Sequence, residues 1–262
     1  QRLIEKMEEM GLPCREESEG RGYPASDAAS SVLDTLRLTA EHLGAEEVTG
    51  FEAVRVRRDA EGFVAEAADG RREWAKLLLL TTGGRAASKF AGYDLARALG
   101  HSVTPLIPAL LPFKTDAAAI KGLNGVRCKC AATLLCSGKQ ILREEGEVLF
   151  KDYGLSGICI MDLTRHLTPA VKSPAVELDL FPDVAEDALS VLFAARVPLL
   201  PGDTAADFWL GLLNPKLGRA LWSAAALPDT AALTPGQWQK LARTAKHWRF
   251  EGLTPCGWRQ AQ

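Results

Sequence analysis

Three prolines close together, Pro105, Pro108 and Pro112, constrain this chain more than any other feature of its sequence. Proline fixes its own backbone angle, lacks an N–H donor and disfavours helix in the residue before it. No regular helix survives three prolines at this spacing, so we expect an extended crossing and a domain boundary here. The sequence on either side predicts two differently built regions, residues 1–104 and the remainder.

The first region predicts alternating helices and strands. Apolar residues at helical spacing predict an amphipathic helix over residues 3–10 and another over 29–43, capped by Ser26 or Asp27 and ended by Gly44. Strands are expected over 48–57, with Val54 and Val56 on one face, over 63–67 and over 74–81. The leucine run 77–80 is apolar on both faces, which is typical of a parallel strand covered by helices. A short helix over 92–99 follows.

Beyond the prolines, the spacing of the apolar residues changes twice along the chain. Residues 105–182 predict short strands at 126–136, 139–143 and 147–150, with turns at Ser137-Gly138 and Glu145-Gly146, as in an antiparallel sheet or small barrel. Residues 183–248 predict a helical subdomain, with helices at 184–197, 204–213, 216–226 and 234–247. Residues 249–262 are extended again and are expected to return toward the first region. The fold class is therefore α/β (mixed α+β).

Charge excludes two classes of partner. The net charge of the 262-residue chain is −2, which gives no broad field for nucleic acid or an anionic membrane. The balance is uneven, −6 through Lys76 and +4 beyond it. The leucine run 77–80 is also far too short to span a bilayer. We expect a small-molecule substrate, no nucleic acid and no membrane.

Six cysteines occur without a C-x-x-C pair, which does not suggest a secreted disulfide framework. Reduced thiols and a cytoplasmic location are the expectation. Cys128 and Cys130 lie two apart on a predicted strand and share a face. A metal there would need ligands from elsewhere, so we expect buried strand residues and no metal site.

Familiar catalytic signatures are absent. The sequence has no G-x-G-x-x-G, no phosphate-binding G-x-x-x-x-G-K-[ST], no G-x-S-x-G and no H-E-x-x-H. The four histidines fall at no recognisable catalytic spacing. No catalytic acid, base or nucleophile is assigned.

Three short motifs stand above this background. LLLLTTGG is a predicted strand that ends in Gly83 and Gly84, where a ligand can approach the backbone, although many α/β proteins turn on glycine there. GRGYPAS places Arg21, Tyr23, Pro24 and Ser26 before a helix N-terminus, which favours an anion or serves as an ordinary N-cap. DYGLSG, residues 152–157, is best explained as a tight turn without chemistry, with Ser156 a candidate cap for the segment 158–166.

Together and in this order, these motifs resemble the HI0933-like or YhiN-type bacterial flavoproteins, often described as NAD(P)/FAD-dependent oxidoreductases. The resemblance also includes GYDLARALGHSVTPLIPALLPFKT, EGEVLFKDYGLSG, VELDLFPD and the closing LTPCGWRQAQ, so it covers nearly the whole chain. It implies a partial FAD-binding domain of the glutathione-reductase type, interrupted by a β-barrel-like part and a helical part.

The resemblance also implies site residues. Thr82, Gly83 and Gly84 match the stretch that lies against FAD, and the strand around Ala53 would approach its adenine side. Arg21, Tyr23, Pro24 and Ser26 match a Gly-Arg-x-Phe-Pro-x-Ser pattern near the active site, with Tyr for Phe. NAD(P)H is a candidate electron donor.

The sequence departs from the family pattern in several places. Thr81 stands where Ala is usual, Ile158 replaces a Pro, and the loop between Gly84 and Gly92 is shortened to RAASKFA. The N-terminal G-x-G-x-x-G strand and the C-terminal flavin-site segment are missing. With Gln1 in place of Met, the chain is expected to be an internal piece of a longer protein, or to have a processed or engineered start.

Two functions follow as hypotheses. The first is a part of a flavin-dependent oxidoreductase that transfers hydride or electrons, with the chain alone holding FAD poorly and showing no turnover. The second is a non-enzymatic module that binds a substrate or partner or pairs protomers. Its motivation is that five of the six tryptophans lie beyond residue 200, although core packing explains them more simply.

Overall fold

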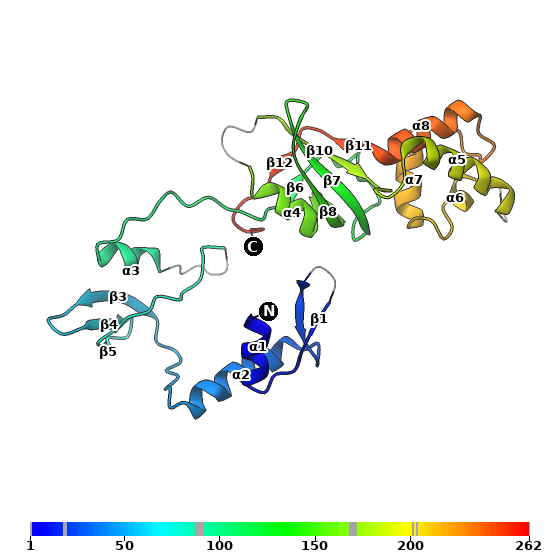
Figure 1. The fold of residues 1–262 in the computed structure, drawn as a ribbon. Coiled ribbons are helices and arrows are strands. Elements are labelled where there is room, and N and C mark those ends of the chain that lie inside the picture. The colour runs from blue at the N-terminus through cyan, green and yellow to red at the C-terminus, as the bar shows by residue number, and fades with distance from the viewer. Residues whose placement is uncertain are drawn as a thin grey trace. The chain divides into compact units, whose positions relative to one another are not determined.

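The computed structural model describes residues 2–17, 20–86, 92–167, 172–200, 202 and 204–261. The chain divides into two compact units, the first made of residues 1–79 and 95–101 and the second of 80–94 and 102–262. Figure 1 traces the chain through both units. The mixed α/β class is confirmed, although every strand pairing in the described residues is antiparallel.

The first unit combines helices with small antiparallel sheets. Its elements are α1 (Arg2–Glu9), β1 (Cys14–Glu16), β2 (Gly22–Pro24), α2 (Ala29–His42), β3 (Ala53–Arg58), β4 (Phe63–Ala67) and β5 (Arg72–Ala75). β1 pairs with β2, and β4 lies between β3 and β5. The helix α3 (Tyr93–Ala98) crosses the boundary between the units.

Burial in the first unit is sparse. Val56, Val64 and Ala67 are buried in the β3–β5 sheet, whereas α1 and α2 bury none of their residues. The apolar side chains predicted along α2 are present, but Leu33 stays 56% exposed. The described part of this unit therefore lacks a cover for the apolar face of α2.

Two sequence predictions about side chains fail in this unit. The N-cap of α2 is Ala28, with no side-chain cap, because Asp27 takes a positive φ of 54° and Ser26 bonds to Ser31 instead. Val54 does not share the face of Val56, because the β3–β4 register shifts at this position. Such a bulge turns the extra residue outward.

The predicted strand over 74–81 is the largest error. Its regular part, β5, ends at Ala75, and residues 77–80 pair with no strand among the described residues. Leu77 and Leu79 are 87% and 85% exposed. A strand requires a hydrogen-bonding neighbour as well as an apolar pattern, and the described residues supply none.

The second unit begins with a seven-stranded antiparallel sheet of order β11-β10-β7-β8-β9-β6-β12. Its strands are β6 (Phe113–Lys114), β7 (Arg127–Cys136), β8 (Lys139–Lys151), β9 (Gly154–Ser156), β10 (Pro174–Asp179), β11 (Trp248–Phe250) and β12 (Thr254–Pro255). The predicted turn at Ser137-Gly138 joins β7 to β8, and both residues have positive φ. The predicted turn at Glu145-Gly146 is wrong, because β8 continues through Gly146 opposite Cys130.

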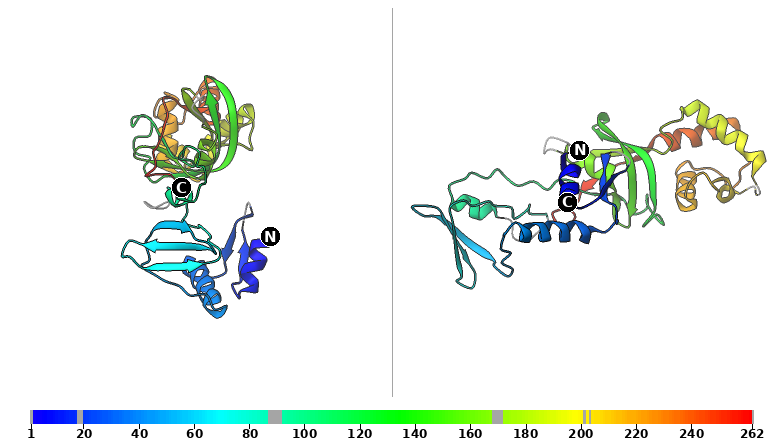
Figure 2. Two further views of the ribbon diagram at one scale, coloured as in Figure 1. Left: turned by 90° about the vertical axis from the view of Figure 1, so that its left-hand side faces the viewer. Right: turned by 60° about the horizontal axis from the view of Figure 1, so that its bottom comes forward.

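One chain segment forces this sheet to curve. β11 and β12 form its opposite edges, yet only residues 251–253 separate them. Seven strands laid flat would place these edges about 29 Å apart, whereas four Cα steps reach at most about 14 Å. The sheet therefore curls into a barrel-like shape, visible in Figure 2, with α4 (Ile158–Thr164) packed against β7, β8 and β9.

The C-terminal helices form the rest of the second unit (Figure 1): α5 (Glu186–Arg196), the 3₁₀ turn η2 (Val197–Leu199), α6 (Ala205–Phe208), α7 (Pro215–Ala224) and α8 (Pro235–Lys246). The capping box of Thr234 and Gln237 begins α8, and Asn214 caps α7. All four predicted helices are present. The predicted 204–213 helix shortens to α6, and Gly211 beyond it takes a φ of 72°.

Buried aromatic rings hold these helices together. Trp209, Trp222 and Trp238 are buried, and Phe208 lies within 4.9–5.4 Å of all three ring centroids. Trp248 is buried beside the barrel rings, and Trp258 is half-buried. Core packing thus explains the tryptophans, which removes the observation behind the interaction-module hypothesis. Among the described helices, none has the length and apolarity that a membrane crossing demands.

Candidate functional site

The Thr82–Gly84 motif forms an exposed, irregular segment at the start of the second unit. The hydroxyl of Thr82 accepts a hydrogen bond of 2.8 Å from the backbone N–H of Gly92. A Cβ atom at Gly92 would lie only 2.6 Å from that hydroxyl oxygen, so only glycine allows this approach. Thr82 thus pins the motif to the start of α3. Residues 87–91 of the shortened RAASKFA loop lie outside the described residues.

Gly83 and Gly84 leave open space beside the backbone. Gly83 has a φ of 73°, a conformation that favours glycine. A Cβ at Gly84 would meet only the Tyr93 hydroxyl, at 3.8 Å. The exposed backbone of this segment therefore leaves space beside Gly84.

Arg85 connects the motif to the C-terminal segment. Its guanidinium lies over the Trp258 ring, 4.8 Å from the ring centroid, a favourable cation–π distance. This C-terminal segment also contacts the barrel, since the backbone N–H of Cys256 donates a hydrogen bond to the carbonyl of Pro112. Sequence reasoning missed this contact, which joins residues more than 170 positions apart.

The second predicted cluster lies on the β1–β2 hairpin of the first unit. Tyr23 is 39% exposed and pairs across the hairpin with Arg15, while Pro24 pairs with Cys14. Arg15 binds Asp27 at 2.5 Å and Glu17 at 3.2 Å. These two hydrogen-bonded carboxylates raise the pKa of Arg15. Arg21 is half-buried directly before this strand.

Ala53, the remaining predicted cofactor residue, begins β3 and pairs with Ala67. It belongs to the first unit with Arg21, Tyr23, Pro24 and Ser26, whereas Thr82, Gly83 and Gly84 belong to the second. The structure therefore groups the predicted residues into two sets, each described within its own unit.

Packing explains the DYGLSG motif, but only Asp152 and Tyr153 form the predicted turn, because Gly154–Ser156 form β9. A Cβ at Gly154 would overlap the carbonyl of Phe113, and one at Gly157 would overlap the carbonyl of Glu147. The N-cap of α4 is Gly157, not the predicted Ser156, and it carries a φ of 98°. These glycines allow β9 and α4 to approach their neighbouring strands closely.

Three thiols meet inside the barrel. Cys130 is buried, and the neighbouring thiols of Cys128 and Cys159, together with burial, raise the pKa of its thiol. Within the described ranges, no group of three or more His, Cys, Asp or Glu side chains is arranged to hold a metal ion.

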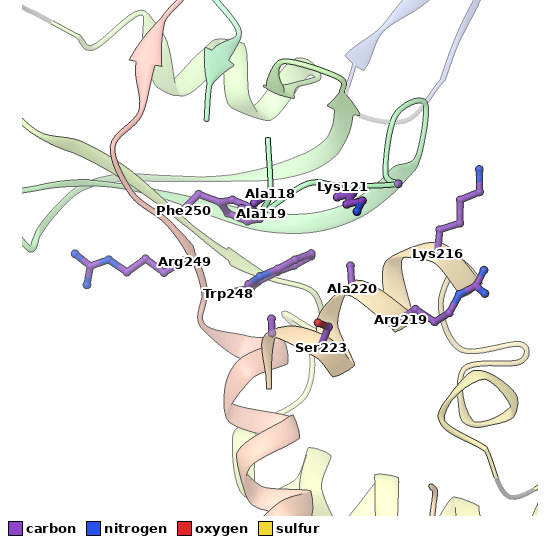
Figure 3. A pocket seen from close by; sticks show the side chains of 12 residues that line it. Ala118, Ala119, Lys121, Lys216, Arg219, Ala220, Ser223, Trp248, Arg249 and Phe250 are labelled. Atoms are coloured by element: carbon purple, nitrogen blue, oxygen red, sulfur yellow. The ribbon is translucent and has the colours of Figure 1, made fainter. Parts of the chain in front are cut away.

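The second unit also contains a cavity of about 730 Å³ that sequence reasoning missed. It lies between α7, the loop that follows β6 and strand β11 (Figure 3). Three exposed basic side chains, Lys121, Lys216 and Arg219, line it. The related signal in the sequence was the net positive charge beyond Lys76, and this charge does not locate the cavity.

Comparisons with known proteins agree with this architecture. Residues 107–262 match the family model described as the HI0933-like protein barrel and H2TH domain. One relative is the 3-dehydro-bile acid delta(4,6)-reductase of Clostridium scindens, which is 32% identical over 237 residues. That match covers 86% of this chain and 57% of the relative, so the chain spans little more than half the relative's length.

The family match covers more than half of the chain and includes the whole barrel and helical part of the second unit. The relative extends the similarity over most of the chain. The chain therefore belongs to the HI0933-like flavoprotein family.

Proposed function

We propose that this chain is the central part of an FAD-dependent reductase that transfers hydride through its flavin to an organic substrate. The observation that carries the proposal is the match to a curated reductase across 86% of the chain. The longer protein would contain the segments that complete the flavin site. FAD supplies the hydride chemistry when bound, and the protein orients it and tunes it electrostatically.

The residues present fit one side of such a cofactor. The segment around Gly83 and Gly84 offers exposed backbone with open space where a side chain would otherwise project. The exposed leucines Leu77 and Leu79 shortly precede it in the chain. We propose that a neighbouring strand of the longer protein pairs with 77–80, which would bring the motif to a strand end as in other dinucleotide sites.

The described residues do not fit the cofactor's pyrophosphate. In the part of the chain that the structure describes, no glycine-rich turn joins a strand to a helix N-terminus in the way that phosphate groups require. Thr82 holds the motif in place through Gly92. Ala53 is proposed to contact the adenine side of the cofactor, and Arg21, Tyr23, Pro24 and Ser26 are proposed to lie near the substrate.

Activity tests this proposal. The protein would be produced with the adjoining coding sequence on both sides, loaded with FAD and supplied with NADH or NADPH. The relative's name identifies its substrates as 3-dehydro bile acids with double bonds at positions 4 and 6, so conjugated oxo-steroid acids are the first substrates to test. Donor-dependent loss of the conjugated double bond supports the proposal, and a protein that holds FAD without reducing any acceptor contradicts it.

A further inference from the structure

The cavity in the second unit has an unbalanced lining. Its charged residues, Lys121, Lys216, Arg219 and Arg249, are all basic. Figure 3 shows Lys121, Lys216 and Arg219 gathered at one end, while Arg249 lies across Trp248 and points away. Arg249 pairs with Glu251 at 3.0 Å. The other three have no ion pair within the described residues, so their positive charge remains available to a ligand.

A second cavity of the same unit is lined by both acidic and basic residues. Lys240 and Arg243 line it opposite Glu186 and Asp187, so acids and bases offset one another there. Basic side chains that face only one another repel, and such an arrangement costs free energy unless an anion joins them. The first cavity thus has the electrostatics of an anion site.

Small apolar residues make up much of the remaining wall. Ala118 and Ala119 lie on one side and Ala220 and Ala224 on α7, with the edge of Trp248 between them. The cavity volume of about 730 Å³ falls within the range of sites for drug-sized molecules and far exceeds what a single inorganic anion needs. The space therefore suits an apolar body attached to an acidic group.

We propose that this cavity binds an organic anion with an apolar body, whose acidic group is held by Lys121, Lys216 and Arg219. Lys216 and Arg219 lie three apart on α7, so they project from one helix face. Lys121 approaches from the loop before β7. This inference goes beyond the proposed reductase activity, because binding here needs no flavin.

Equilibrium dialysis of the full chain tests the inference. The probe is radiolabelled cholate, kept below its micelle concentration, and the competitors are its uncharged methyl ester and inorganic phosphate. We expect saturable binding of one cholate, weakened by salt, with little competition from the ester or from phosphate. No saturable binding, or equal competition by the ester, overturns the anion requirement. Equal competition by phosphate overturns the proposal that the cavity also binds an apolar body.

Variants locate the site. K216Q/R219Q removes two exposed charges and is expected to weaken cholate binding by about tenfold or more. The matched control K139Q/K172Q removes two exposed charges that do not line the cavity and should leave affinity unchanged. A224L keeps every charge but narrows the cavity, so it should also weaken binding.

Equal effects of the two charge variants would show that only net charge matters and would overturn the site. Unchanged binding in A224L would do the same. Circular dichroism melts of each variant confirm that it is folded. Because no flavin is present, failure here leaves the reductase proposal standing, and loss of reductase activity in the longer protein leaves this result standing.

Discussion

Gly218 is the residue at which packing is least forgiving. It is buried inside α7, and an added Cβ would overlap the indole ring of Trp209. Trp209 is fully buried, and its Nε1 lacks a hydrogen-bond partner in the described residues. The aromatic core has therefore accepted an unpaired polar atom to seat this ring. A glycine at this helix position is explained by contact, because helix propensity alone disfavours it.

G218A is expected to lower the free energy of unfolding by about 1–3 kcal/mol, because the methyl group displaces Trp209. G236A in α8 is the matched control. Nothing lies within 4 Å of a Cβ there, so alanine should raise stability by up to about 1 kcal/mol. Urea unfolding measures both. If G218A proved as stable as G236A, the close contact between Gly218 and Trp209 would be wrong.

Cys130 makes stability depend on pH. The neighbouring thiols of Cys128 and Cys159, then burial, raise the pKa of its thiol in the folded protein. The unfolded chain releases this proton near pH 8.5, whereas the folded chain keeps it. The unfolded state then binds fewer protons, so stability falls as pH rises above about 8.5, by up to about 1.4 kcal/mol per pH unit.

Urea unfolding between pH 7 and 10 measures this slope, and C130A should reduce it. If the Cys130 thiol did not stay protonated in the folded protein, the stability of the parent protein and of C130A would change in parallel with pH. Parallel curves would therefore contradict the raised pKa of Cys130.

Among the elements, β10 and α8 are joined by a nearly buried ion pair. Lys246 lies 2.8 Å from Asp179, and their side chains are 12% and 9% exposed. Asp179 also accepts from the N–H of Phe181 and from Arg143, and Lys246 donates to the carbonyl of Phe181. The pair fixes the end of the helical part onto the sheet.

D179A should cost about 3 kcal/mol of stability, because Lys246 would remain buried without its counterion. E145A removes only an exposed partner of Arg143 at 3.7 Å and should change stability by less than about 0.5 kcal/mol. Chemical unfolding compares them. Similar losses of stability in the two variants would mean that the buried Asp179–Lys246 pair contributes no more than the exposed contact of Glu145.

Elements governed by local sequence were predictable. Phe63–Ala67 forms the strand expected from its pattern, and Ser137-Gly138 forms the expected turn. Gly146 was predicted to lie in a turn. It pairs with Cys130 of β7 across the β7–β8 hairpin, and this pairing keeps it in strand β8. Residues 77–80 misled the prediction because an apolar pattern does not supply a partner strand.

The candidate site was predictable only in part. The order of the motifs indicated the family that the comparisons confirm. The cavity was not foreseeable, because it joins Lys121 to Lys216 and Arg219, almost a hundred residues later. No local pattern encodes a contact over such a distance.

At the scale of the whole molecule, the two units differ in how well they are packed. The second holds one continuous apolar core from the barrel into the helices. The first leaves Leu33, Leu77 and Leu79 exposed. Exposed apolar faces of this kind mark surfaces that other segments cover, which agrees with a chain that spans 57% of its relative. We propose that the flavin domain is completed there.

The most direct measurement of the central claim is the FAD content of the longer protein. It would be purified, heat-released and assayed by mass spectrometry, beside G84L and the control G236L. Neither glycine has a positive φ or a crowded Cβ, so both variants should fold. We predict one FAD per chain in the parent protein and in G236L and a loss of at least tenfold in G84L. Absence of FAD from the parent protein, or full occupancy in G84L, would contradict a flavin site at Thr82–Gly84.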